Sequence, residues 1–93
     1  NDIGDWGVIY DLTKKDKQGN AAISYGSNGG GHISLDSKNN LIQFDDQLIA
    51  TVGVENLIIV DTGDAVLICS KDKAEEVKGL VKLLKEKKLT HYV

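Results

Sequence analysis

The chain has 93 residues, a formal net charge of −3 and a pI near 5.2. This length allows one domain with a thin core, and the lack of a clustered basic excess argues against a nucleic-acid-binding protein. No apolar stretch approaches the ~20 residues of a membrane-spanning helix, so we expect neither a nucleic acid nor a membrane as a partner.

The cysteine and histidine content indicates a reducing compartment and no zinc site. Cys69 is the single cysteine, which excludes an internal disulfide and fits the cytoplasm. It closes an apolar run, where a thiol usually behaves as a small buried hydrophobe. His32 and His91 lie far apart, with no other cysteine or histidine near either. A zinc site needs several such ligands at close spacing, so none is expected.

Residues 5–13 (DWGVIYDLT) predict a short helix. A polar segment follows at residues 14–20 (KKDKQGN) and predicts a turn. One face of the helix would carry four residues at helical spacing, namely Trp6, Ile9, Tyr10 and Thr13.

The next segment, residues 24–32 (SYGSNGGGH), contains four glycines and is predicted to be a loop. The glycines at 29–31 suggest a phosphate-binding loop. However, the spacing required for a Walker or a dinucleotide-binding loop is missing, and no helical pattern follows. We therefore interpret residues 26–31 as part of a surface loop whose role the sequence does not define.

From residue 33 the pattern changes to short β-rich runs. Segments 33–37, 42–46 and 58–62 share the order Ile, any residue, apolar residue, Asp, small or acidic residue. Asn40-Leu41-Ile42 and Asn56-Leu57-Ile58 also align at an offset of 16. With two further runs, at 48–52 and 65–69, five short strands separated by turn residues predict an all-β coil or roll.

The Asp61-Thr62-Gly63 triplet resembles the catalytic turn of aspartic proteases. That chemistry needs two carboxylates that share a proton, whereas this chain has one copy of the triplet. We interpret it as a hairpin turn in which Gly63 supplies a positive φ and Asp61 accepts a hydrogen bond from its own backbone two residues on.

Residues 71–88 predict a terminal helix, because apolar side chains recur three and four positions apart. Asp72 and Glu75 resemble a capping box, and lysines gather in the last turn, which suits the helix dipole. The residues expected to face the core are Val77, Leu80, Val81 and Leu84.

Three segments together resemble bacterial mannose-1-phosphate guanylyltransferases: NDIGDW, VIYDLTKKDKQGN and LIATVGVENLIIVDTGDAVLICSKDKAEEVKGLV. Members of that family carry Trp-x-Asp-(Val/Ile)-Gly-Ser-Trp at the end of their catalytic domain. The part GVENLIIVDTGDAVLI is the most specific. The chain departs from the family at Asp5, where Ser is usual, and in its Gly-rich loop, which looks like an insertion.

The resemblance implies a fold that is mainly β with a C-terminal α-helix: a roll of short strands like a left-handed β-helix, preceded by a short helix. It implies that residues 1–19 are the tail of the catalytic domain with a linker helix. Residues 20–93 would then form the β-helix-like module with its terminal helix.

The family makes GDP-mannose and pyrophosphate from GTP and mannose 1-phosphate, with Mg²⁺ as cofactor. The resemblance maps one Mg²⁺ carboxylate onto Asp2, which on residues alone is a helix cap or a surface acid. No other catalytic or nucleotide-binding residue of the family falls in this chain. It implies that a catalytic domain precedes the chain and that the chain alone is inactive.

Two alternatives remain open from the sequence. The chain could be a docking or oligomerisation module without chemistry, or part of a pyrophosphorylase for another sugar nucleotide. We also expect a homo-oligomer whose contact involves either the helix at 5–13, through Trp6, Ile9 and Tyr10, or a sheet edge.

Overall fold

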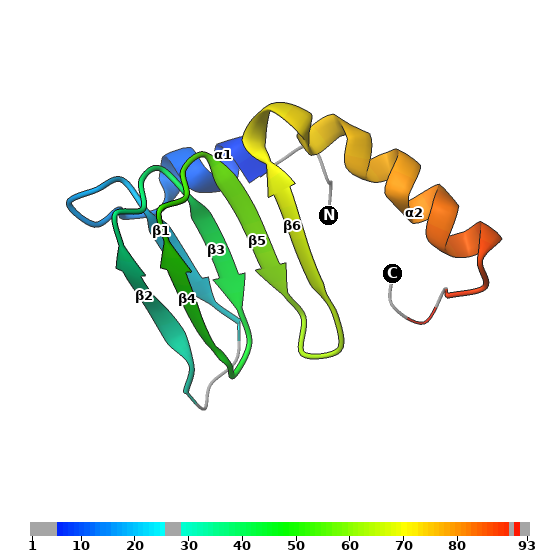
Figure 1. Cartoon of the computed structure of the whole chain (residues 1–93), viewed down its shortest axis with the longest axis horizontal. Helices are drawn as coiled ribbons and strands as arrows, with labels where there is room; N and C mark the ends of the chain where they lie inside the picture. Colours follow the sequence, from blue (N-terminus) through cyan, green and yellow to red (C-terminus); the bar gives the residue numbers. More distant parts are fainter. Residues whose placement is uncertain (1–5, 26–28, 90, 92–93) are drawn as a thin grey trace.

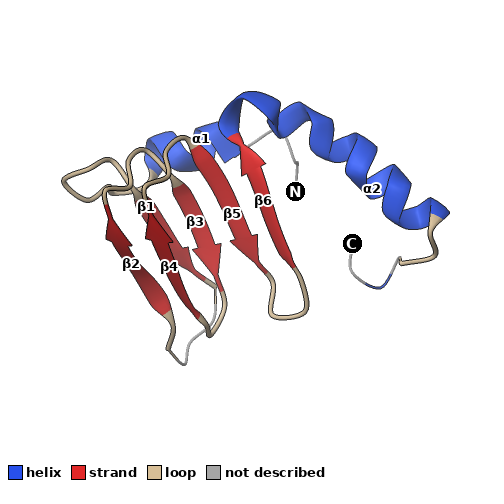
Figure 2. Ribbon diagram, in the orientation of Figure 1, coloured by secondary structure: helices blue, strands red, loops and turns tan. Residues whose placement is uncertain are grey.

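The computed structural model describes residues 6–25, 29–89 and 91, and this part of the chain contains two short sheets flanked by helices (Figures 1 and 2). Two α-helices and a 3₁₀ segment accompany the sheets: α1 (Trp6–Leu12), η2 (Lys71–Glu76) and α2 (Val77–Glu86). The strands are β1 (Ala21–Ser24), β2 (Gly31–Leu35), β3 (Leu41–Phe44), β4 (Leu48–Val52), β5 (Leu57–Asp61) and β6 (Val66–Ser70).

Successive strands alternate between the two sheets, so the chain winds as a coil. Sheet A has the order β1-β3-β5-β6, and sheet B consists of β2 and β4. All pairs are parallel except β5 with β6, which form an antiparallel hairpin. Residue 31 pairs with residue 48, and residue 41 with residue 58, so one turn of the coil advances the chain by 17 residues.

The first turn of the coil is longer than the second. Residue 21 pairs with residue 41, which is an advance of 20 residues. The extra length falls between β1 and β2, where the Gly-rich segment lies, and this agrees with its interpretation as an insertion. Gly30 has φ +80°, and a Cβ there would lie 2.5 Å from the carbonyl oxygen of Gln47. Only glycine fits this corner without displacing the neighbouring turn.

The predicted 16-residue offset is wrong by one residue. Asn39 and Asn56 both have φ 58° and occupy equivalent corners, because the register that pairs Leu41 with Ile58 also aligns residue 39 with residue 56. Asn40 therefore corresponds to Leu57 rather than to Asn56. The shared strand template is also misleading, because the first copy, at 33–37, begins in sheet B, whereas the other two begin in sheet A.

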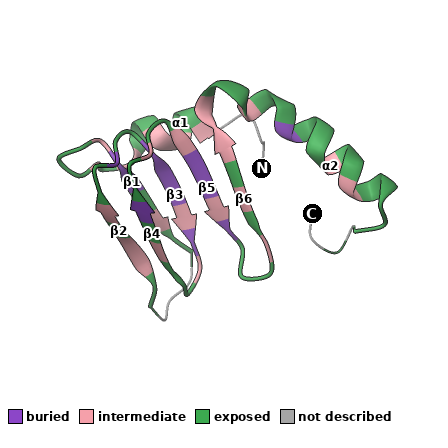
Figure 3. Cartoon of the chain, viewed as in Figure 1, coloured by how far each residue is buried: buried purple, intermediate pink, exposed green. Residues whose placement is uncertain are grey.

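The core lies on both sides of sheet A, because neighbouring residues of a strand point to opposite faces. Buried side chains concentrate in β3 and β5 (Figure 3). One cluster, on the side of α1, contains Ala21, Leu41 and Ile58. The other, on the side of sheet B, contains Ile42, Phe44 and Ile59, with Ile49 of β4 against it. The described residues thus form three layers: α1 with η2, then sheet A, then sheet B.

The predicted fold class is confirmed in its main features. The five predicted strands are present, with their ends shifted by up to two residues, and β1 is an additional strand that was missed. In the part of the chain that the structure describes, the coil does not close into a full β-helix, because sheet B ends after two strands whereas sheet A continues to β6.

The terminal helix differs from its prediction. Its first part is 3₁₀ rather than α, and neither η2 nor α2 has a side-chain cap, so the predicted Asp72–Glu75 capping box is wrong. Val77 is the buried residue of α2, whereas Leu80 is 40% exposed. The expectation that Leu80 faces the core is therefore wrong, because α2 extends away from β6 beyond the sheets (Figure 1). No helix within the described ranges is long and apolar enough to cross a membrane.

Candidate functional site

Asp2, the predicted Mg²⁺ ligand, lies outside the residues that the structure describes, which begin at Trp6. Within the described ranges, no three side chains of the metal-binding types gather closely enough to hold a metal ion. The described structure nearest to Asp2 in the chain is α1, which begins four residues later. The contacts of α1 are therefore described first.

The apolar side of α1 packs against the body of the coil. Trp6, Ile9 and Tyr10 contact the cluster formed by Ala21, Leu41 and Ile58. A helix is thus confirmed within the predicted range, and three of the four residues predicted to share a face pack against the coil, partly buried. Thr13, the fourth, lies beyond the end of α1. The same contacts correct another expectation, because these three side chains are not available as an exposed surface for self-association.

Tyr10 joins three parts of the chain. Its hydroxyl donates a hydrogen bond to the carbonyl oxygen of Gly19, at the corner before β1. The ammonium of Lys71, at the start of η2, lies 3.3 Å from the ring centroid, and that of Lys15 lies 4.6 Å from it. A cation over an aromatic face contributes about 0.5–2 kcal/mol. Burial raises the pKa of the Tyr10 hydroxyl, so the side chain remains a neutral donor near pH 7.

A ladder of two buried asparagines runs along the coil at the start of β1 and β3. Asn20 is 3% exposed and Asn40 is fully buried. The Oδ1 atom of Asn20 accepts hydrogen bonds from the backbone and side-chain nitrogens of Asn40, both at 3.0 Å. Asn20 Nδ2 donates to the carbonyl oxygen of Ser37 at 2.8 Å.

Asn40 extends this ladder to the next turn of the coil. Its Nδ2 also donates to the carbonyl oxygen of Val54 at 3.3 Å, and its Oδ1 accepts from the backbone nitrogen of Leu57 at 2.8 Å. These bonds satisfy the Leu57 backbone nitrogen and give the Val54 carbonyl oxygen a second donor beside the Lys38 backbone nitrogen. Buried polar groups require such partners. The ladder is therefore structural.

Asp61 is also fully buried and is held by structural contacts. Its carboxylate accepts hydrogen bonds from Gln47 Nε2 at 3.0 Å and from the Gly63 backbone nitrogen at 2.9 Å. Gly63 has φ +96° and lies in the hairpin between β5 and β6. The predicted turn at 61–63 is confirmed.

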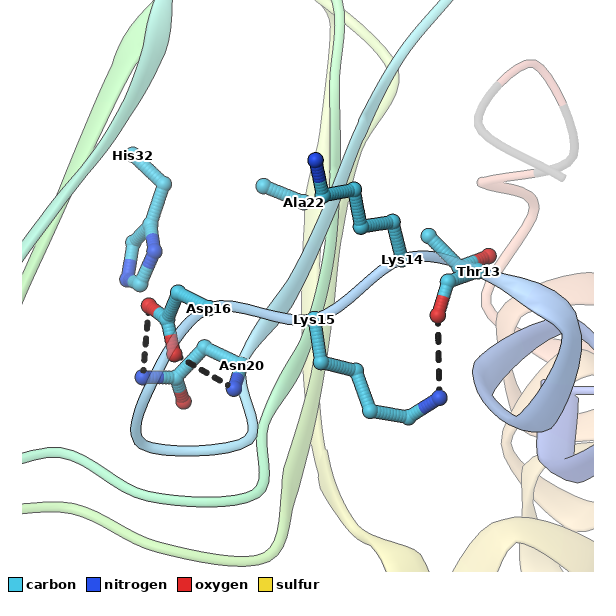
Figure 4. Close-up of a pocket in the computed structure, with 7 residues that line it drawn as sticks. All are labelled: Thr13, Lys14, Lys15, Asp16, Asn20, Ala22 and His32. Atoms are coloured by element: carbon cyan, nitrogen blue, oxygen red, sulfur yellow. Dashed lines mark hydrogen bonds between the residues drawn. The ribbon is translucent and has the colours of Figure 1, made fainter.

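An open pocket of about 460 Å³ lies between the segment after α1 and strand β2 (Figure 4). Asp16 accepts hydrogen bonds from the backbone nitrogens of Gln18 and Asn20, both at 2.9 Å. Burial works to raise the pKa of Asp16, but these donors hold it below the usual value. The lining residues are Thr13, Lys14, Lys15, Asp16, Asn20, Ala22 and His32.

His32 forms the far wall of this pocket. Its Nε2 lies 2.9 Å from Thr51 Oγ1, which joins β2 to β4. Burial lowers the pKa of His32, and the nearby carboxylate of Asp16 opposes this, so the ring is neutral at pH 7. Within the lining, Asp16 bonds Asn20 and Lys15 Nζ donates to the Thr13 carbonyl oxygen. Such contacts are typical of a structural corner.

Cys69 behaves as the sequence predicted. It is half-buried against the cluster of Ala21, Leu41 and Ile58, and its thiol donates a hydrogen bond to the carbonyl oxygen of Ser70 at 3.1 Å. Burial raises the pKa of this thiol, and Glu76 adds to the effect. A reactive thiolate is disfavoured in such surroundings.

Sequence reasoning missed the asparagine ladder and the contacts of Tyr10. A signal for the ladder was present, because Asn20 and Asn40 each stand directly before an apolar pair that enters a strand. The contacts of Tyr10 left no such signal, since Gly19 and Lys71 come near it only through the fold.

Comparisons with known proteins place these features in a family. The family model described as "MannoseP isomerase/GMP-like beta-helix domain" matches residues 30–84. A mannose-1-phosphate guanylyltransferase of Escherichia coli is 37% identical over 92 residues, which are 99% of this chain and 18% of that protein. The xanthan biosynthesis protein XanB of Xanthomonas campestris is 41% identical over 85 residues, which are 91% of this chain and 17% of that protein.

A solved structure agrees with these matches. The crystal structure of a mannose-1-phosphate geranyltransferase from Thermus thermophilus has a TM-score of 0.71 and 32% identity, and the match covers 91% of this chain and 24% of that one. The chain thus spans less than a quarter of the length of each protein named here. The resemblance that the sequence predicts is confirmed, and the chain belongs to the mannose-phosphate isomerase/GMP-like β-helix domain family.

Proposed function

We propose that this chain is the β-helix-like module of a mannose-1-phosphate guanylyltransferase, which makes GDP-mannose and pyrophosphate from GTP and mannose 1-phosphate. The observation that supports this most is the match of 99% of the chain to 18% of such an enzyme. The proposal includes a boundary at residues 19 and 20, between the tail of the catalytic domain and the module.

In this proposal the module fixes the end of the catalytic domain. Asp2 stands four residues before Trp6, and α1 is held against the module by three apolar side chains and by the hydroxyl of Tyr10. Anchoring α1 limits where the preceding residues can lie, and precise placement of a catalytic carboxylate is worth several kcal/mol of the barrier. Asp2 would supply one carboxylate to Mg²⁺, which neutralises charge on the phosphates when bound. Among the described residues, no group of three histidine, cysteine, aspartate or glutamate side chains lies close enough to bind a metal ion.

The proposal is tested by Asp2→Asn in the longer protein that contains the catalytic domain. We expect kcat to fall about 100-fold or more, because a neutral amide replaces a charged metal ligand. A helix cap would tolerate the same change, since Asn and Asp cap helices about equally well. The measurement is steady-state release of pyrophosphate from GTP and mannose 1-phosphate, repeated over a range of Mg²⁺ concentrations.

The matched control is Asp5→Asn, which removes the same charge three positions away, where the family usually has Ser. We expect this variant to keep near-normal turnover. Equal turnover of Asp2→Asn and the unaltered protein would show that Asp2 is no ligand. An unaltered protein that turns over another nucleotide or sugar phosphate instead would favour the alternative of a different sugar-nucleotide pyrophosphorylase.

A further inference from the structure

Lys71 is the residue through which the C-terminal part of the chain reaches helix α1. It is the first residue of η2 and follows directly after β6. Its backbone nitrogen donates a hydrogen bond to the carbonyl oxygen of Asn56 at 2.9 Å, which ties its backbone to a corner of the coil. Its ammonium lies 3.3 Å from the centroid of the Tyr10 ring. The side chain therefore connects the coil to a helix from the opposite end of the sequence.

The surroundings of Lys71 favour this contact with the ring. The side chain is half-buried, and burial lowers the pKa of its ammonium. The carboxylate of Asp11 opposes this shift, and the ammonium of Lys15 adds to it. A cation that has lost part of its hydration gains more from the face of an aromatic ring than an exposed cation does. The contact between Lys71 and Tyr10 is therefore stronger than one made by a lysine free in solvent.

Lys15, the second cation near the Tyr10 ring, has a different role. Its Nζ lies 4.6 Å from the ring centroid and donates hydrogen bonds to the carbonyl oxygens of Asp11 and Thr13, at 3.3 and 2.9 Å. Asp11 belongs to α1, and Thr13 is the residue directly after it. Lys15 thus stabilises the end of its own helix, whereas Lys71 fixes that helix to another part of the fold.

Helix α1 depends on such a contact for its direction. It has seven residues, none of which is fully buried, and a helix of this length is marginal by itself. Trp6, Ile9 and Tyr10 pack against the coil, but apolar packing is not directional and lets a short helix pivot. The Tyr10 hydroxyl binds the Gly19 carbonyl oxygen, and Lys71 covers the face of the same ring. Together these two contacts fix the ring, and with it the direction of α1.

We propose that Lys71 is a positioning residue of the guanylyltransferase reaction, acting through Tyr10 and α1 on the end of the catalytic domain. This inference rests on the proposed function. Asp2 stands four residues before Trp6 in the sequence, so the direction of α1 limits where this candidate Mg²⁺ ligand can lie. A shift of about 1 Å at a reacting group can cost about 100-fold in rate, even when the altered residue is far from the chemistry. Lys71 itself touches no substrate.

The contact is tested in the 93-residue chain by NMR spectroscopy, without any substrate. The methylene protons beside the Lys71 ammonium should resonate upfield of those of Lys78, because they lie over the face of the Tyr10 ring, whereas Lys78 is exposed on α2. The signal is assigned by its loss in Lys71→Met. A Lys71 signal at the position of the Lys78 signal would overturn the proposal.

The positioning role is tested by Lys71→Met in the longer protein that contains the catalytic domain. Methionine keeps an unbranched side chain but removes the charge. We expect kcat to fall about 10-fold, and the Mg²⁺ concentration for half-maximal rate to rise by about the same factor. The KM for mannose 1-phosphate should stay unchanged, because the family resemblance places no sugar-binding residue in this chain.

Two further variants separate the cation from a general effect on folding. Lys71→Arg keeps a cation that stacks on an aromatic ring and should retain most of the activity. Lys78→Met, the matched control, removes an equal charge from an exposed position of α2 and should leave both constants unchanged. If Lys71→Met does not fold, as judged by circular dichroism, Lys71→Gln replaces it with the same expected result. Equal losses for Lys71→Met and Lys78→Met would overturn the proposal.

Combining Lys71→Met with Asp2→Asn distinguishes this inference from the proposed function. A residue that acts through Asp2 adds nothing once the ligand is lost, so the double variant should turn over at the rate of Asp2→Asn alone. Full activity of Lys71→Met, or losses that multiply in the double variant, would overturn the positioning role and leave the proposed function in place. Normal turnover of Asp2→Asn would instead contradict the role of Asp2 itself, whatever the Lys71 variants do.

Discussion

Replacing Asn40 by alanine is expected to destabilise the chain by about 3–5 kcal/mol, which is a large part of the stability of a small domain. The side chain is fully buried. Its loss leaves the Leu57 backbone nitrogen without this partner, and it removes one of the two donors to Asn20 Oδ1 and to the Val54 carbonyl oxygen. A buried polar group left without a partner costs about 1–3 kcal/mol, and the alanine also leaves a small cavity.

The measurement is urea unfolding followed by circular dichroism, at one protein concentration so that association does not change between variants. Asn39→Gly is the matched control at the preceding residue. Asn39 is exposed and has φ 58°, a conformation that glycine adopts readily, so we expect a change below about 1 kcal/mol. Equal losses for the two variants would contradict a ladder that ties the turns of the coil together.

Asn40→Asp separates hydrogen bonding from side-chain volume. It keeps an acceptor for the Leu57 nitrogen but places a second oxygen where Asn40 Nδ2 donates to Asn20 and Val54. At about pH 7 the buried carboxylate faces two acceptors and should destabilise the fold. Protonation at about pH 4 restores a donor, so the variant should lose less stability there.

Local patterns predicted the elements whose structure depends on near neighbours. The helix at α1 and its buried face follow from the spacing of Trp6, Ile9 and Tyr10. The hairpin at Gly63 follows from its freedom to adopt a positive φ and from the Asp61 side chain two residues before it. Strand β4 matches its predicted ends, because Leu48–Val52 is bounded by turn residues on both sides.

The period of the coil could not be read reliably from the sequence. The corners at Asn39 and Asn56 are equivalent, and they correspond to a period of 17 residues. Because residue 40 is also an asparagine, aligning Asn40 with Asn56 gives an equally good match with a period of 16. Only the strand register distinguishes the two. β1 was missed for a related reason: it has four residues and lies between a polar turn and the Gly-rich segment.

The sequence also could not show what covers an apolar face. Leu35 and Val52 follow the alternation of a strand with a buried side, yet that side is open in the described structure. Likewise, the periodicity of α2 shows which residues share a stripe but not whether a partner lies against it. Asp2, the candidate metal ligand, rests on family resemblance and stays a prediction.

Truncating Leu41 to alanine is expected to cost about 3–5 kcal/mol, the loss typical of a leucine in a well-packed core. Leu41 is fully buried in the cluster against which α1 packs. The same truncation at Leu80, which is 40% exposed on α2, should cost less than about 1 kcal/mol, since little apolar surface returns to water. The two variants lose the same atoms, so most of the difference reflects burial, and a smaller part reflects the different preference of alanine for a strand and for a helix.

Trp6, the single tryptophan, packs against the cluster that contains Leu41, so its fluorescence reports on this region during denaturant unfolding. Leu41→Ala should lower the urea midpoint with an unchanged slope, and Trp6 should become more accessible to a soluble quencher in the folded state. Leu80→Ala should leave both quantities close to those of the unaltered chain. A larger loss at Leu80 than at Leu41 would mean that α2 packs against the body of the protein in solution, and that the stability of the module comes from its terminal helix rather than from α1.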